Sequence, residues 1–186
     1  IPQPHRIAKV VEQIPEIAAY TFRGQAFSLV SSADRTYGVV VTGIDPQKEA
    51  RVSRLKQLVR EGHFLVGNDR NQAVVGKLLA QNLRAKIGDE LTLLGQGRDG
   101  SIAATVVSVK GIFSSGIDEF DRAAMQIPLT TFQDTFSMDQ AVHEIVAHGL
   151  ALVDHADAAG VVDAVAEEHV VLDPVVVAVA QGQRAA

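Results

Sequence analysis

Apolar residues recur at two different spacings near the start of this chain. Within residues 5–13 they fall three or four positions apart, which predicts a helix, and Pro15 ends it because a proline disfavours helical geometry in the residue before it. Residues 17–31 and 37–44 are instead rich in aromatic and β-branched residues, which predicts two partner strands. Gly24 interrupts the first of these strands and predicts a bulge or a bend.

The next segment begins with a helix-start signal. Asp45 can accept hydrogen bonds from the first free N–H groups of a helix, and Pro46 suits the first helical position. Apolar residues at helical spacing follow, and Gly62 is placed to end this helix in the left-handed conformation. A second helix is predicted over residues 71–84, and Gly88 stops it.

Two strands joined by a tight glycine-rich turn dominate residues 86–121. They predict a β-hairpin over residues 89–110. The chain then continues through glycines into an acidic loop at residues 118–121. Residues 125–128 are predicted to form a short strand and residues 129–135 a helical turn.

The last quarter of the chain alternates strand and helix patterns. Residues 142–153 predict a strand, residues 156–168 an amphipathic helix, and residues 170–172 a short strand. A second aspartate–proline pair at residues 173–174 repeats the helix-start signal before residues 175–180. A β-α-β end of the domain is therefore expected.

This end resembles the opening α-β-β segment more than it resembles the middle of the chain. We therefore predict an α+β fold with two lobes. Both chain ends, residues 1–45 and 137–186, form an outer α/β lobe. A smaller mixed α/β lobe, residues 46–136, is inserted into it and carries the hairpin.

The composition excludes several classes of function. The 186 residues are 47% hydrophobic and 21% charged, which is ordinary for a globular protein. The net charge of −5 argues against a nucleic-acid groove, which needs clustered lysine and arginine. The absence of cysteine removes disulfides, thiolate metal sites and cysteine nucleophiles. No apolar run approaches the ~18 residues of a membrane helix. Because the chain starts with isoleucine, we expect it to be a piece of a larger protein.

Residues 95–100 match the dinucleotide-binding fingerprint G-x-G-x-x-G letter for letter. That site needs a helix whose N-terminus holds the pyrophosphate. Residues 101–109, SIAATVVSV, are instead rich in β-branched residues and predict a strand. We therefore interpret Gly97 and Gly100 as turn residues and predict no cofactor.

Other catalytic or metal-binding constellations are not apparent in the sequence. The six histidines include no metal-binding spacing, and His143 and His148 would point to opposite faces of the predicted strand. No serine lies in a G-x-S-x-G motif, and Ser114 and Ser115 are interpreted as a flexible exit from a strand. The sequence therefore predicts neither catalytic nor metal-binding residues.

Two polar loops are the candidates for contact with a partner. The acidic loop places three carboxylates within four residues, which could bind a hard cation. The calcium-loop pattern is absent, however, and Phe120 interrupts the acidic group, so a solvated loop with one buried aromatic anchor is preferred. The hairpin turn is the second polar loop. The predicted partner-contact residues are Gln96, Arg98, Asp99, Asp118, Glu119, Phe120 and Asp121.

Five segments, in order along the chain, resemble the periplasmic domain of ABC-transporter permeases of the MacB/FtsX/LolC–LolE type. Together they span residues 37–136, more than half of the sequence. The segments are YGVVVTGIDP at residues 37–46, EGHFL at residues 61–65, AVVGKLLAQNL and IGDELTL within residues 73–93, VKGIFSSGIDEFD at residues 109–121, and a helix-like segment at residues 127–136.

The resemblance implies a domain inserted between the first two transmembrane helices of a permease subunit, on the periplasmic side of the cytoplasmic membrane. It also implies that the outer lobe made from both chain ends is porter-like. It implies no catalysis by the domain itself. The implied partners are a cytoplasmic ATPase acting through the membrane helices, a second permease subunit, and an envelope protein or lipoprotein. The implied activity is to couple ATP hydrolysis to the export or release of a lipoprotein, lipid, drug or peptide.

One connection distinguishes the chain from permeases that resemble the lipoprotein exporter LolC. Those carry an extended hairpin hook that receives a periplasmic chaperone, whereas a short turn at residues 95–101 joins the two strands here. The chain is therefore closer to a hookless permease. A soluble protein-binding or scaffold module is the first alternative, and a hydrolase with a spatially assembled site is the second.

Overall fold

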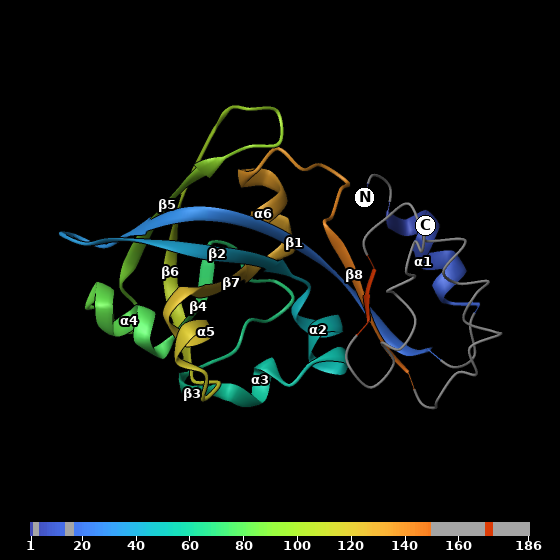
Figure 1. Ribbon diagram of the computed structural model, residues 1–186, viewed down its shortest axis with the longest axis horizontal. Coiled ribbons are helices and arrows are strands. Elements are labelled where there is room, and N and C mark those ends of the chain that lie inside the picture. Colours follow the sequence, from blue (N-terminus) through green and yellow to red (C-terminus); the bar gives the residue numbers. More distant parts are fainter. Residues whose placement is uncertain (2–3, 14–16, 150–169, 173–186) are drawn as a thin grey trace, which may run out of the picture.

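The computed structural model describes residues 1, 4–13, 17–149 and 170–172, and this part of the chain combines six helices with a nine-stranded sheet (Figure 1). The predicted α+β class is confirmed. The helices predicted over residues 156–168 and 175–180 lie outside the described residues, as does the end of the strand predicted over residues 142–153.

Six strands form a closed ring. Consecutive neighbours around it are β2, β7, β4, β6, β5 and β1, and the ring closes because β1 also pairs with β2, from Arg23–Ile44 to Ser31–Thr36. The pairs β2–β7 and β4–β6 are parallel, and the other pairs in the ring are antiparallel. The ring strands are β1 (Ile17–Ser31), β2 (Thr36–Ile44), β4 (Gln72–Gly76), β5 (Glu90–Gln96), β6 (Ile102–Phe113) and β7 (Ala124–Pro128).

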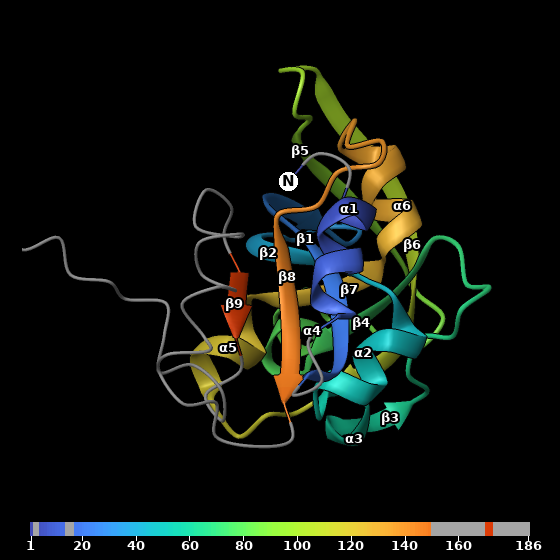
Figure 2. The same cartoon turned by 90° about the vertical axis from the view of Figure 1, so that its right-hand side faces the viewer.

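Three more strands extend this ring. Strand β8 (Glu144–Gly149) runs antiparallel to the first half of β1, and β9 (Val170–Leu172) runs parallel to β8. Strand β3 (Val59–Gly62) pairs with the end of β6. The long strand β1 therefore belongs to the ring through its second half and carries β8 on its first half (Figure 2).

Short helices fill the connections between strands, and several match the sequence-based predictions. The predicted cap at Asp45 is confirmed, because its carboxylate accepts hydrogen bonds from the backbone N–H groups of Gln47 and Lys48 at 3.0 and 3.2 Å. The helices predicted at the N-terminus and over residues 129–135 are also confirmed. The helices are α1 (Pro4–Val11), α2 (Pro46–Val52), α3 (Leu55–Leu58), α4 (Lys77–Leu83), α5 (Asp118–Ala123) and α6 (Leu129–Thr135).

The single helix predicted over residues 71–84 is wrong in its first half. Residues 72–76 form β4, which lies between β6 and β7, and only the second half is α4. A strand buried on both faces is apolar at successive positions, so Val74 and Val75 match a helical spacing equally well. Arg84, in the left-handed region at φ 54°, ends α4, so Gly88 is not its stop signal.

Two glycines have a different role from the one predicted. Gly62 does not end α2, which stops at Val52; it lies in β3, where a Cβ atom would stand 2.2 Å from the carbonyl oxygen of Lys110. The β1–β2 register runs through Gly24 without a bulge. Close approach to the Phe132 ring explains Gly24, because a Cβ atom there would lie 2.3 Å from the ring. Gly24 therefore serves packing, whereas Gly62 combines a close backbone contact with the predicted left-handed conformation, at φ 70°.

The interior of the ring is filled by the apolar side chains of its strands and by α6. Phe132 and Phe136 lie on consecutive turns, with ring centroids 4.6 Å apart and almost no exposed surface. Gly24 and Gly43 leave the space that Phe132 occupies. A second cluster, around Phe113, packs beneath α3 and the following loop. Burial of these aromatic residues fixes α6 against β1 and β2.

The predicted division into two lobes stays a prediction. Strands from both predicted lobes pair in the same sheet, because β1 pairs with β5 and β2 pairs with β7. Residues 46–136 nevertheless contain the complete β5–β6 hairpin, and that predicted hairpin is confirmed.

Candidate functional site

The two predicted partner-contact loops lie in different parts of the molecule. The hairpin turn between β5 and β6 projects at one end of the ring, and α5 lies beside α4 on the body of the domain (Figures 1 and 2). The structure therefore does not join them into one site, and each is considered by itself.

The hairpin turn is held by its own side chains. The Asp99 carboxylate accepts hydrogen bonds from the Ser101 backbone N–H at 3.0 Å and from the Ser101 hydroxyl at 2.6 Å, which lowers the pKa of Asp99. Gly100 has φ +83°, and a Cβ atom on Gly97 would lie 2.8 Å from the Asp99 carboxylate. The Arg98 backbone N–H bonds to the Phe136 carbonyl oxygen at 2.9 Å. Strand β6 follows at once, so these glycines form a hairpin turn, as predicted.

The predicted acidic loop is a short helix, α5. Its residue Asp121 is buried and accepts hydrogen bonds from both Ser115 groups, the backbone N–H at 2.8 Å and the hydroxyl at 2.7 Å, and from the Ser114 hydroxyl at 3.0 Å. These bonds lower the pKa of Asp121, although burial opposes them. Ser114 and Ser115 are thus held in place by Asp121.

Asp118, Glu119 and Phe120 reach the surface of α5, so the partner-contact prediction there depends on these three residues. Phe120 is 41% exposed, so the prediction of a buried aromatic anchor is wrong, although one side of its ring packs on Phe113 with ring centroids 5.5 Å apart. Ile117, just before the helix, is 64% exposed. The surface of α5 therefore combines apolar and acidic groups.

Sequence reasoning missed a cleft of about 540 Å³ at the carboxyl ends of β2 and β7. These parallel strands end side by side at Ile44 and Pro128, and each leads directly into a helix. The cleft is closed on one side by the loop between β3 and β4, through Val66, Gly67 and Asn68. In the sequence, each of the two strand ends that line the cleft is marked only by a proline, Pro46 or Pro128. The cleft was missed because the parallel pairing of β2 with β7 was not predicted.

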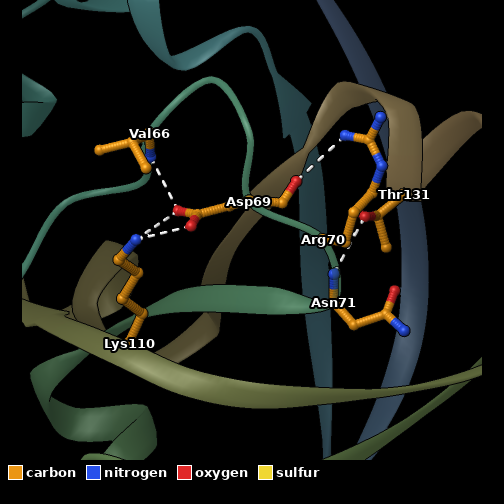
Figure 3. Close-up of polar contacts among 6 residues, drawn as sticks. All are labelled: Val66, Asp69, Arg70, Asn71, Lys110 and Thr131. Carbon is orange, nitrogen blue, oxygen red and sulfur yellow. Dashed lines mark hydrogen bonds and ion pairs between the residues drawn. The ribbon is translucent and has the colours of Figure 1, made fainter.

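Asp69 holds this loop in place (Figure 3). Its carboxylate accepts hydrogen bonds from the Lys110 ammonium group at 2.5 and 2.7 Å and from the Val66 backbone N–H at 2.8 Å. The Arg70 guanidinium bonds to the Asp69 carbonyl oxygen at 3.1 Å, and the Asn71 backbone N–H bonds to the Thr131 hydroxyl at 3.3 Å. The loop is thus attached to both β6 and α6.

An ion pair between a partly buried arginine and a fully buried glutamate joins α2 to β1. The Arg23 guanidinium donates to both carboxylate oxygens of Glu49, at 2.6 and 3.0 Å, and the Glu49 side chain is fully buried. Glu144 lies opposite Arg23 in the β1–β8 pairing. Burial raises the pKa of Glu144, the Arg23 charge lowers it, and the Glu49 charge raises it. Two carboxylates therefore lie close to one arginine.

The histidines form no site in the described part of the chain. The His143 Nδ1 atom accepts a hydrogen bond from the Gln25 backbone N–H at 2.9 Å, which requires the neutral imidazole. Among the described residues, no three histidine, aspartate or glutamate side chains gather as a metal site.

No helix in the described ranges is long and apolar enough to cross a membrane.

The chain belongs to the family described as the MacB-like periplasmic core domain, which matches residues 2–168. It is therefore a periplasmic domain of the MacB-like transporter class, as the ordered sequence segments predicted. No curated protein matches it by sequence.

Two solved structures show the same fold. The extracellular domain of the noncanonic ABC-type transporter YknZ from Gram-positive bacteria superposes with a TM-score of 0.60 at 13% identity, covering 84% of this chain and 76% of that one. The periplasmic region of MacB from Actinobacillus actinomycetemcomitans superposes with a TM-score of 0.57 at 11% identity, covering 88% and 72%. The fold is shared despite the low sequence identity.

Proposed function

We propose that this chain is the extracytoplasmic domain of an ABC-transporter permease subunit and that it couples cytoplasmic ATP hydrolysis to the export or release of a substrate. The observation that carries the proposal is the family match over residues 2–168. The fold shared with domains of YknZ and MacB supports it. The domain contributes binding and movement, and no chemical step is assigned to its residues.

The proposed partners follow from the same role. A cytoplasmic ATPase acts through the membrane helices of the parent subunit, and a second permease subunit stands beside it at the inner membrane. The hairpin turn, through Gln96, Arg98 and Asp99, and the exposed side of α5 contact an envelope protein or lipoprotein. The short turn between β5 and β6 supports a hookless permease. Lipoprotein, lipid, drug and peptide remain the candidate substrate classes.

The proposed lobes supply the moving parts. In this proposal residues 46–136 respond as a unit to a partner, and residues 1–45 with 137–186 connect that unit to the membrane. Helix α2 is the point of connection, because Glu49 lies in the first range and its partner Arg23 in the second.

The first test is the parent reading frame, which should encode an apolar helix of about 20 residues on each side of this domain. The second test uses the parent permease reconstituted in liposomes with its ATPase. Phe120→Asp, or replacement of residues 97–101 by a two-residue turn, should change the ATP hydrolysis rate at least twofold. Val10→Asp is the control, since Val10 is 41% exposed on α1. Unchanged rates in all variants, or a secreted parent without membrane helices, would contradict the proposal.

A further inference from the structure

A groove is lined by β3, α4 and the end of β6. Its two adjoining hollows, of about 290 and 250 Å³, share Glu61, Lys77 and Ile112. The floor is apolar, because Ile112, Ala80 and Ala85 are almost fully buried. We call this feature the basic groove, because the charged residues that line it besides Glu61 are Arg60, Lys77, Arg84 and Lys86.

The four cations of the basic groove are exposed and unpaired. Within the described part of the chain, none of them forms an ion pair or a side-chain hydrogen bond. Lys77 lines both hollows, whereas Arg60 lines only one of them and Arg84 and Lys86 line only the other. The positive charge is therefore spread along the groove. Glu61 is the only carboxylate that opposes it among the described lining residues.

The stability of α4 does not explain two of these cations. Lys77 is the first residue of the helix, where a positive charge opposes the helix dipole. Arg84 ends the helix in the left-handed region, at φ 54° and ψ 32°. Its charge suits this end of the dipole, but glycine adopts that backbone conformation at lower cost. Residues that the local structure disfavours point to a role for their side chains in binding.

We infer that the basic groove binds an acidic, extended segment of a partner protein. In an extended chain, side chains on one side recur about every 6.6 Å. Carboxylates at alternate positions of one segment can therefore pair with several cations along the groove, whereas a single small anion can pair with only some of them. Small apolar groups of the segment can contact the floor at Ile112. Complementary charge at the rim selects such a partner and orients it.

An anionic membrane fits the basic groove less well. The apolar floor is almost fully buried, so a flat layer of lipid headgroups would meet only the rim. Helix α5 packs beside α4 and exposes Asp118 and Glu119, which anionic lipid would repel. The inference also goes beyond the proposed function and does not depend on it, because binding of an acidic segment is a property of this domain by itself.

The test uses the full chain and a peptide of alternating glutamate and alanine that ends in tryptophan. The chain itself contains no tryptophan, so the fluorescence anisotropy of the peptide reports binding directly. Binding should be saturable and should weaken as salt is raised. Lys77→Glu should weaken it about fivefold. Lys9→Glu, the matched control on α1 at the opposite end of the molecule, should leave it unchanged (Figure 1).

Three further variants and measurements separate binding from folding. A negative charge suits the first turn of a helix, so Lys77→Glu should unfold at no lower urea concentration than the unchanged chain. Arg84→Gly should likewise keep or raise that concentration, yet weaken peptide binding about threefold. Glu61→Lys should strengthen binding, and a peptide of alternating lysine and alanine should not bind.

Three results would overturn the inference. The first is equal peptide binding by Lys77→Glu and Lys9→Glu, and the second is no saturable binding at millimolar peptide. The third is Lys77-dependent binding of phosphatidylglycerol vesicles without peptide binding, which would assign the groove to a membrane. Groove-dependent peptide binding by a chain whose parent lacks membrane helices would support the inference and contradict the proposed function alone.

Discussion

Arg23 and Glu49 form a two-point ion pair in which the carboxylate is entirely buried, with N–O distances of 2.6 and 3.0 Å. The pair fixes α2 on β1, next to the position where Lys48 lies over the rings of Tyr20 and Phe22 at 5.2 Å. Because the two residues are 26 positions apart and belong to different predicted lobes, this contact is the natural place to probe the connection between them.

The first prediction concerns the two carboxylates near Arg23. Glu49→Gln should lower the free energy of unfolding by about 3 kcal/mol, because it removes the fully buried charge that accepts both hydrogen bonds from the partly buried Arg23 guanidinium. Glu144→Gln, the matched control, should leave stability at neutral pH unchanged or raise it, because it removes the repulsion between Glu144 and Glu49. Urea denaturation at pH 7 measures both. Equal losses in the two variants would show that Arg23 depends on both carboxylates alike.

The same pair of variants predicts a pH dependence. The pKa of Glu144 is higher in the folded than in the unfolded chain, so the folded chain holds the proton more tightly. Stability from this group is therefore present below the ordinary glutamate pKa and is lost as the pH rises through the raised folded value. Glu144→Gln should remove this component from a plot of unfolding free energy against pH. An unchanged slope in that range would contradict the raised pKa.

The contribution of His143 to stability should depend on pH in the opposite direction to that of Glu144. Partial burial, the amino group of Ile1 and the Arg98 guanidinium lower the pKa of His143 below the ordinary histidine value. Its contribution to stability is thus present above the ordinary pKa of about 6.5 and is lost as the pH falls through the lowered folded value. An imidazole titration by NMR should show the lowered pKa. Protonation of His143 should break the hydrogen bond from the Gln25 amide to Nδ1, so that this amide exchanges faster. In His143→Ala the Gln25 amide should exchange fast at every pH.

Alanine substitutions at Gly24 and Gly43 should respond differently to a smaller side chain at position 132. A Cβ atom on Gly24 would meet the Phe132 ring at Cε1, at 2.3 Å, whereas one on Gly43 would meet Phe132 at Cβ, at 2.4 Å. Each alanine variant should lose about 1–3 kcal/mol from overpacking. Phe132→Leu removes the outer ring atoms but keeps Cβ and Cγ. It should therefore lessen the cost of Gly24→Ala and leave that of Gly43→Ala unchanged. Thermal or urea unfolding of the three single variants and the two double variants gives the comparison.

Variants of Asp69 and Lys110 should distinguish two interactions that hold the loop beside the cleft: the Asp69–Lys110 ion pair and the hydrogen bond from the Val66 amide to Asp69. Lys110→Gln removes the partly exposed ion pair and should cost about 0.5–1 kcal/mol. Asp69→Ala also removes the acceptor of the Val66 amide, so hydrogen exchange at that amide should accelerate strongly in Asp69→Ala and only slightly in Lys110→Gln. Equal exchange rates in the two variants would show that Lys110 alone positions the loop.

Local signals in the sequence were sufficient to predict those elements that are stabilised by interactions between residues close together in the chain. The Asp45–Pro46 helix start, the hairpin turn at Gly97 and Gly100 and the alternating strands β1 and β2 depend on residues only a few positions apart, and all were predicted. The ordered family segments were likewise readable in the linear sequence, and the family match confirms them.

Tertiary structure decided the features that depend on distant partners. Strand β4 was mistaken for a helix because only its burial between β6 and β7 distinguishes the two apolar patterns. Gly24 is needed because the Phe132 ring lies against it, and the cleft forms because β2 pairs in parallel with β7. The Arg23–Glu49 ion pair forms only when α2 packs on β1. The sequence by itself determined the hairpin turn, the Asp45 helix cap and the family. Only the closed ring decided which residues meet, because contacts across it join residues that no local pattern connects.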